Sequence, residues 1–185
     1  RSIFRRCPLK SMTVVGDVAQ TSDAAGSSSW AAALNPHARD RWRLAELTVN
    51  YRTPGEIMAL AAPVLAAINP RLAPPSSVRD TGVRPWARAV AHAGELADAV
   101  AAVTQESATD MSAGQLAVLH AGDDGELLAA VRSRIPGAAG EAGPGRRVVV
   151  LPVREAKGLE FDRVILVEPA RIAAAGRHGL GDLYV

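Results

Sequence analysis

The chain has 185 residues, of which 48% are hydrophobic and 22% charged, and its formal net charge is +2. This length and apolar content allow one globular domain, or one domain and part of a second. No apolar run approaches membrane-spanning length and no signal peptide opens the chain, so we expect no membrane contact. The single cysteine, Cys7, excludes an internal disulfide and fits a cytoplasmic location. The charge permits nucleic-acid binding without requiring it.

The hydrophobic pattern predicts strands alternating with helices, which is typical of a parallel, doubly wound α/β sheet. In the first part of the chain we expect a strand over residues 12–15, a helix over 27–34, a strand over 43–49 and a helix over 54–68 with Thr53 as its cap. A loop over 69–85 is followed by a strand over 86–92 and a helix over 95–106. The remaining elements are a strand over 115–120, a helix over 126–135, a loop over 137–145 and two strands within 148–167.

The most informative stretch is residues 148–167, VVVLPVREAKGLEFDRVILV, in which two apolar runs flank a polar hinge. Runs of this kind are typical of strands buried on both faces of a parallel sheet. Loops at the carboxyl ends of such strands face the ligand crevice, so residues 156–160 are expected there. Gly158 permits a tight turn or a close backbone approach, and Leu159 and Phe161 are expected to anchor the loop. A plain strand connection with solvated Lys157 and Glu160 explains these residues equally well.

A phosphate-binding P-loop needs two glycines before its lysine and a hydroxyl residue after it. The chain has only two lysines: Phe4 and Leu9 occupy the glycine positions ahead of Lys10, and Lys157 is followed by glycine. The four histidines are scattered, so we predict no metal site. No buried strand ends in an Asp-Glu pair that could hold Mg²⁺ and activate water. The sequence therefore lacks the parts that hold the phosphates and Mg²⁺ in a complete nucleotide hydrolase.

Three separated segments resemble one family. TVVGDVAQ (residues 13–20), LTVNYRTP (47–54) and VREAKGLEFDRVILVEP (153–169) are similar to motifs III, IV and V of UvrD/Rep-type superfamily one helicases, in the family's order. The amino-acid sequences of these segments are most similar to those of the HelD branch, which consists of ATP-driven factors that release and recycle RNA polymerase. The resemblance implies a RecA-like, P-loop NTPase-type parallel sheet flanked by helices. Residues 1–40 would be the tail of the first RecA-like domain, and 41–185 the second, truncated before motif VI.

The family's motif roles transfer to individual residues of this chain. Gln20 matches the motif III glutamine that senses the γ-phosphate, a task suited to a side chain that both donates and accepts. Tyr51 matches the tyrosine that stacks on adenine, and Arg52 the arginine that reaches the γ-phosphate. The alternatives are a polar turn residue at Gln20 and an ion pair at a helix start for Arg52. A cation at a helix N-terminus opposes the helix dipole, which weakens the latter.

In motif V, Glu160 matches the glutamate that binds the nucleotide ribose, and Gly158 and Lys157 match residues that shape the loop and link it to the opposing domain. Pro152 and Arg154 replace the family's threonine and histidine, so nucleic-acid contact here would be an Arg154–phosphate contact. The aromatic residue that follows the motif III glutamine in unwinding enzymes is absent. No room exists between Arg52 and Lys157 for the large domain that UvrD/Rep helicases insert there.

The resemblance therefore implies one lobe of an ATP-dependent helicase or translocase. Its cofactor would be ATP with Mg²⁺, and its partners would be the first RecA-like domain of the same protein, DNA and RNA polymerase. The chain by itself is expected to be inactive. The main alternative is a non-catalytic RecA-like docking module for RNA polymerase or another protein. A flavodoxin-like or Rossmann-like ligand-binding domain is a third possibility, but no G-x-G-x-x-G motif opens a helix after a strand.

Overall fold

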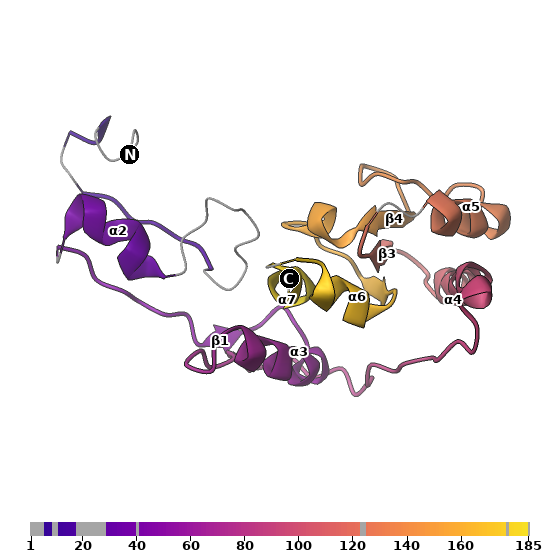
Figure 1. The fold of residues 1–185 in the computed structure, drawn as a ribbon, viewed down its shortest axis with the longest axis horizontal. Coiled ribbons are helices and arrows are strands. Elements are labelled where there is room, and N and C mark those ends of the chain that lie inside the picture. The colour runs from indigo at the N-terminus through magenta and orange to yellow at the C-terminus, as the bar shows by residue number, and fades with distance from the viewer. Residues whose placement is uncertain are drawn as a thin grey trace. The chain divides into compact units, whose positions relative to one another are not determined.

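The computed structural model describes residues 6–8, 11–17, 29–39, 41–122, 125–176 and 178–184. The chain divides into two compact units, the first within Arg1–Arg84 and the second beginning at Pro85. The domain boundary near residue 40 that the family resemblance implies stays a prediction. Each unit is described by itself (Figure 1).

The described part of the first unit contains the helices α2 and α3 and a minimal sheet. Its elements are α2 (Trp30–Ala38), β1 (Val49–Asn50), α3 (Gly55–Ile68) and β2 (Ser76–Ser77). β1 and β2 pair in parallel over two residues each. The backbone carbonyl of Arg79 accepts from the Gly55 amide at 2.9 Å, which ties the start of α3 to the segment after β2.

The predicted helix over 54–68 is confirmed as α3, but its predicted cap is wrong. The N-cap residue is Pro54, which makes no side-chain cap hydrogen bond, rather than Thr53. Pro63 lies inside the helix without ending it, and the helix ends at Ile68 before Asn69. The N-terminal helix also differs from its prediction, since α2 runs past Asn35 and contains Pro36.

Three predicted strands are absent from the described residues. Residues 12–15 and 86–92 form no strand, and of 43–49 only Val49 enters one. Leu47 and Val49 are 88% and 54% exposed, so this apolar segment lacks a packed surface on which a strand could form. The preference of such residues for strands reflects fit to a half-buried sheet, and without a neighbouring surface it has no effect.

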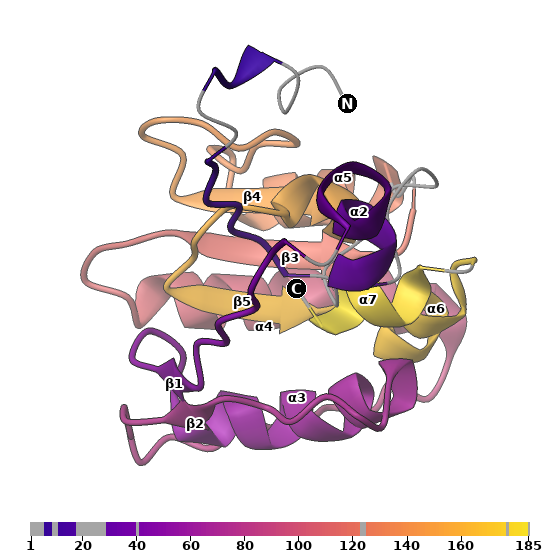
Figure 2. The same cartoon turned by 90° about the vertical axis from the view of Figure 1, so that its left-hand side faces the viewer.

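The second unit is an α/β domain built on a three-stranded parallel sheet, as predicted for the chain. Its strands are β3 (Leu116–His120), β4 (Val148–Pro152) and β5 (Arg163–Leu166), in the order β4-β3-β5. Figure 2 shows β3 between its two neighbours. β3 begins opposite Val148 of β4 and opposite Arg163 of β5, and both pairings are parallel.

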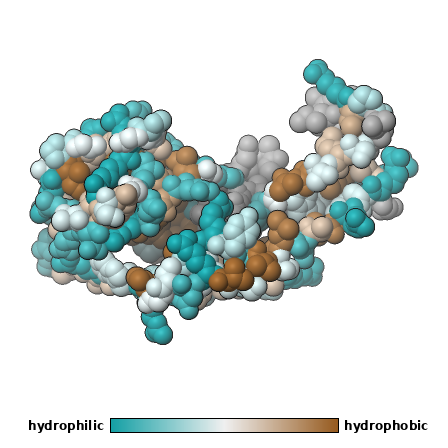
Figure 3. All heavy atoms as spheres, turned by 180° about the vertical axis from the view of Figure 1, so that it is seen from behind, coloured by the Kyte–Doolittle hydropathy of each residue, from teal (hydrophilic) through white to brown (hydrophobic). Residues whose placement is uncertain are grey.

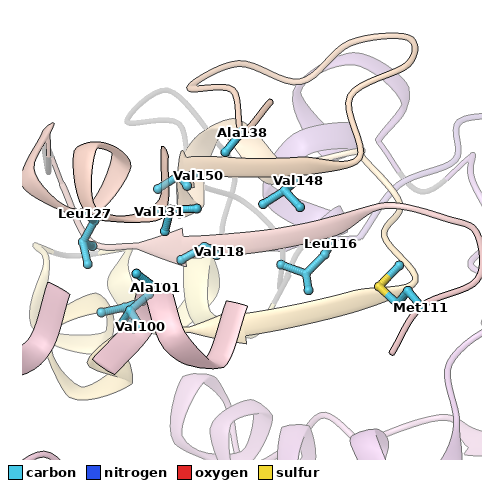
Figure 4. Close-up of a cluster of buried hydrophobic side chains, with 11 residues drawn as sticks. Val100, Ala101, Met111, Leu116, Val118, Leu127, Val131, Ala138, Val148 and Val150 are labelled. Carbon is cyan, nitrogen blue, oxygen red and sulfur yellow. The ribbon is translucent and has the colours of Figure 1, made fainter. Parts of the chain in front are cut away.

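Helices cover both faces of this sheet. The short helix η1 (Ala93–Glu95) leads into α4 (Leu96–Thr109), and α5 (Gly125–Arg134) follows β3. α4 and α5 pack on one face, where Val118 and Val150 meet Ala101 and Val131 (Figure 4). Fully burying a valine or leucine side chain contributes roughly 1.5–3 kcal/mol, so this cluster is the main source of the unit's stability.

The other face of the sheet packs against the C-terminal part of the unit. Leu119 and Leu151 form a cluster with Ile172 of α6 (Pro169–Ala174), and Leu183 of α7 (Gly179–Tyr184) packs against it. β5 is incompletely covered on this face, since Val164 and Leu166 are 49% and 43% exposed. The prediction that both apolar runs of 148–167 are buried on two faces is therefore confirmed for β4 and wrong for β5. No helix in the described part of the chain is long and apolar enough to cross a membrane.

We predict that Gly179→Ala destabilises the second unit by about 1–3 kcal/mol. A Cβ at Gly179 would overlap the backbone carbonyl oxygens of Ile172 and Ala173, so α7 could no longer approach α6 as closely. The free energy of unfolding, measured in urea on residues 1–185, provides the test. Gly94→Ala is the matched control, because a Cβ at Gly94 meets nothing within 4 Å. Equal stabilities for the two variants would contradict this packing.

Candidate nucleotide-binding segments

Two short segments carry the described residues that the sequence analysis assigned to a nucleotide. The tyrosine–arginine segment, residues 50–54, belongs to the first unit. The lysine–glycine segment, residues 153–161, belongs to the second unit. Gln20, the predicted γ-phosphate sensor, lies outside the described residues. Each segment has its own local geometry, which follows from the hydrogen bonds of its backbone.

The tyrosine–arginine segment joins β1 directly to α3. The Asn50 side-chain oxygen accepts from the backbone amides of Arg52 at 2.9 Å and Thr53 at 3.0 Å. This is the local turn that asparagine side chains commonly form when a strand ends. The Asn50 amide nitrogen in turn lies 3.4 Å from the Met58 sulfur of α3. The side chain of Asn50 therefore fixes the backbone path from strand to helix.

Residues after β2 hold the same segment from the other side. Ser77 Oγ donates to the Thr53 carbonyl oxygen at 2.6 Å, and an Arg79 guanidinium nitrogen donates to the Arg52 carbonyl oxygen at 3.0 Å. These bonds satisfy the backbone and leave the Tyr51 and Arg52 side chains at the surface. Tyr51 is 81% exposed, although an aromatic side chain gains most when it is covered. The segment thus presents an aromatic ring beside a guanidinium on a fixed backbone.

A carboxylate at the start of α3 braces this segment further. Glu56 Oε1 accepts from the Thr81 amide at 3.0 Å and from the Thr81 hydroxyl at 3.2 Å. The pKa of Glu56 is lowered from 4.5 to about 2. The largest cause is the hydrogen bond to the Asp80 side chain, and the backbone amides of Glu56, Thr81 and Gly82 lower the pKa further. A carboxylate in the first turn of a helix is also favoured by the helix dipole.

The lysine–glycine segment begins at the carboxyl end of β4. There the chain enters η2 (Val153–Ala156), which buries Val153 and Ala156 and exposes Arg154. The Ala156 carbonyl oxygen then accepts from the Leu159 amide at 2.9 Å. Lys157 has φ −60° and ψ 124°, and Gly158 has φ +80°. These angles define a type II turn, whose third position requires positive φ and so favours glycine. The predicted role of Gly158 in a turn is confirmed.

The anchors of this segment differ in part from the prediction. Phe161 packs against the second core cluster, as predicted, and Val153 and Ala156 belong to that cluster. Leu159 is 43% exposed and does not anchor the loop. The turn residues Lys157 and Glu160 are exposed, which keeps their charged ends at the surface.

Glu160 lies elsewhere than the sequence analysis placed it. β4 and β5 are parallel neighbours of β3, so the chain between them must return from the carboxyl end of the sheet to the amino end. Asp162 has already reached the amino end, since its amide donates to the Gln115 carbonyl oxygen just before β3. Two residues span at most about 7 Å, so Glu160 lies nearer the amino end than the carboxyl end. Of the predicted residues 156–160, only those at the start of the turn lie near the carboxyl end of the sheet, where the crevice was expected.

The carboxyl end of the sheet holds two polar residues that sequence reasoning missed. His120 closes β3 and is 5% exposed, and its Nδ1 atom is buried without a hydrogen-bond partner. Glu168 follows β5 with φ 48°, a left-handed conformation that is uncommon outside glycine, and Arg171 binds its carboxylate at 2.9 Å. His120 could have been identified from the sequence, because a histidine ends the otherwise apolar run LAVLH.

Within the described ranges, no three His, Cys, Asp or Glu side chains come together in a way that could hold a metal ion. No protein-family model matches the chain, and no curated protein matches it significantly. A functional assignment therefore rests on the residues themselves and on the geometry of the two segments.

We predict that the Thr81 amide resonance of residues 1–185 titrates with a midpoint near pH 2. The pKa of Glu56 is lower in the folded protein than its ordinary value of 4.5, so its stabilising bonds are complete above pH 4.5. They are lost as pH falls from 4.5 toward 2. NMR detects the transition, and Glu56→Gln should abolish it.

The Asp80 side chain makes the largest contribution to this low pKa, so Asp80→Ala, which removes that hydrogen-bond partner, should move the midpoint upward toward 4.5. A midpoint near 4.5 in the unsubstituted protein would show that Glu56 does not hold the loop after β2.

Proposed function

We propose that this chain is part of the second RecA-like lobe of an ATP-dependent helicase or translocase of the UvrD/Rep type, closest to the HelD factors that remodel RNA polymerase. In the intact protein, ATP with Mg²⁺ would bind between this lobe and a first RecA-like domain. DNA and RNA polymerase would be the partners. The P-loop and the Mg²⁺ ligands would come from that first domain.

The observation that carries the proposal is the geometry of the tyrosine–arginine segment. A nucleotide site between two lobes needs a ring that can cover adenine and a cation that can reach phosphate. Tyr51 and Arg52 provide both groups on a backbone fixed at each end by side-chain hydrogen bonds. Such preorganisation is what makes an arginine finger effective, because the guanidinium does not have to be ordered during the reaction.

The lysine–glycine segment supports the same proposal by its turn. Lys157 and Gly158 occupy the two central positions of a type II turn that follows a buried strand. An exposed loop on a rigid sheet is the usual carrier of a ligand-contacting group. We infer that Lys157 and Arg154 face the opposing domain or nucleic-acid phosphates. Glu160, which lies nearer the amino end of the sheet, is not part of this proposed contact.

A docking module without catalysis is the second candidate, and one observation favours it. α3 is apolar along most of its length, yet only Leu65 of its residues is buried. Ile57 and Leu60 are 48% and 61% exposed, and Figure 3 shows hydrophobic atoms on the surface of the first unit. Apolar helix surfaces of this kind are common at protein interfaces. This function would use the same fold without a nucleotide.

For the intact protein we predict that Arg52→Ala lowers kcat for ATP hydrolysis by about 10³-fold or more, as for other arginine fingers. Folding should be retained, because alanine keeps the backbone amide and carbonyl of residue 52 that take part in the hydrogen bonds fixing the segment. Steady-state phosphate release and a thermal melt measure the two effects.

Arg71→Ala is the matched control, because Arg71 is an exposed arginine of the same unit whose backbone amide bonds to Asn69. Its kcat should stay close to that of the unsubstituted protein. Unchanged ATPase activity in the Arg52 variant would contradict the motor and favour the docking module.

Residues 1–185 alone should release phosphate from ATP no faster than a buffer blank. The sequence has no P-loop, the glycine-rich loop whose backbone amides and lysine hold the phosphates of ATP for hydrolysis. The measurement is phosphate release by purified protein with MgATP over several hours. Turnover that co-purifies with the chain and is abolished by heat unfolding would overturn this prediction.

A further inference from the structure

Four arginines gather around two adjoining hollows in the second unit. Arg132 and Arg146 line the first hollow with residues 136–141, and Arg134 and Arg147 line the second. The two hollows share Gly137, so their linings form one continuous surface. We call these four arginines the arginine face.

The arginine face lies at the amino end of the parallel sheet. Its second hollow is bounded by the last residues of α4, by Arg134 at the end of α5 and by Val148 at the start of β4. Arg154 and the beginning of the lysine–glycine turn follow the carboxyl end of β4. The arginine face is therefore separate from Arg154 and Lys157, the residues to which the proposed function assigns nucleic-acid contact.

Two of the arginines are held by neutral acceptors. Nη2 of Arg147 donates to the carbonyl oxygens of Ala108, at 3.0 Å, and Met111. Arg132 Nε donates to the Ala138 carbonyl oxygen at 3.0 Å. A carbonyl oxygen satisfies a hydrogen bond without cancelling the charge, and the C-terminal ends of α4 and α5 supply only partial negative charge. Both side chains remain exposed and positively charged.

The other two arginines have weaker partners. Arg146 lies 3.7 Å from Glu141, and their side chains are 48% and 79% exposed, so solvent screens this pair. An Arg134 guanidinium nitrogen lies 3.5 Å from the neutral Gln105 side-chain oxygen. The lining of both hollows thus contains four positive side chains against one negative one. This local excess of three charges is greater than the formal charge of +2 on the whole chain.

The composition of the lining indicates what it binds. Guanidinium groups match phosphate oxygens with paired hydrogen bonds. The lining has no aromatic residue on which an unpaired base could stack, which disfavours a single strand. Its larger apolar members are covered, since Val148 is buried and Ile135 is partly buried, so it lacks the apolar centre of a typical protein interface. A duplex presents phosphates outside and bases inside.

We propose that the arginine face binds the sugar–phosphate backbone of double-stranded nucleic acid without sequence preference. This inference does not rest on the proposed function, because it requires neither ATP nor the tyrosine–arginine segment. Phosphate contacts position a protein on a duplex and carry no sequence information. The face would hold a duplex against this unit whether or not the unit belongs to a motor.

The test is fluorescence anisotropy of residues 1–185 with a labelled DNA duplex of about 20 base pairs, between about 50 and 200 mM salt. Four phosphate contacts predict that log K falls with log salt with a slope of about −3.6. Arg134→Gln with Arg146→Gln should lower affinity at least about tenfold at the lowest salt and reduce the slope by about 1.8. These two residues are chosen because Arg132 and Arg147 also bond to backbone carbonyls of the fold.

The matched control is Arg84→Gln with Arg88→Gln, which removes the same charge from two exposed arginines outside the hollows. It should leave the slope unchanged, and circular dichroism should show both double variants folded. An equal loss of affinity in the control would overturn the proposal, because it would show that the binding depends only on the net charge of the chain. Tighter binding of a single strand of the same length than of the duplex would also overturn the proposal. Tighter binding of polyglutamate than of the duplex would overturn it too, because it would indicate an acidic protein partner.

Discussion

The parallel pairing of β3 on both of its edges is the constraint on which the second unit depends. All five residues of Leu116–His120 are buried, and every one of the first four faces a partner in both β4 and β5. A strand buried in this way needs helices on both faces, which α4 and α5 provide on one side and α6 on the other. Because β4 and β5 flank β3, the connection between them must cross the sheet. That crossing creates the lysine–glycine turn.

The sequence predicted the elements whose apolar pattern is long or strongly clustered. α3, α4, α5, β3 and β4 all lie close to their predicted ranges. Predicted strands failed where the apolar residues have no surface to pack on, as at Leu47, because strand preference depends on context. α7 was not among the predicted elements, because its sequence is rich in glycine, which disfavours a helix. In the structure Gly179 allows the close approach of α7 to α6.

Residue types in the candidate site were more predictable than their positions. The sequence indicated that Gly158 would turn the chain, and the observed positive φ agrees. The position of Glu160 could not be predicted, because it depends on the order of the strands and on the short length of the crossing. Composition also concealed the arginine face, because the formal charge of +2 averages over the whole chain. The combined lining of the two hollows holds four arginines and one acidic residue, Glu141 of the first hollow. A net charge says little about where charges gather.

The proposed function gives the first unit one chemical role, in which a fixed strand-to-helix junction presents a ring and a guanidinium to a nucleotide. The central claim is that Tyr51 meets the adenine of bound ATP in the intact protein. Photo-crosslinking with an azidoadenine derivative of ATP, followed by peptide mapping, measures this contact directly. Label in the peptide that contains Tyr51, reduced by excess ATP and absent in Tyr51→Ala, is the predicted result. ATP-protected label found only in other peptides would contradict the claim.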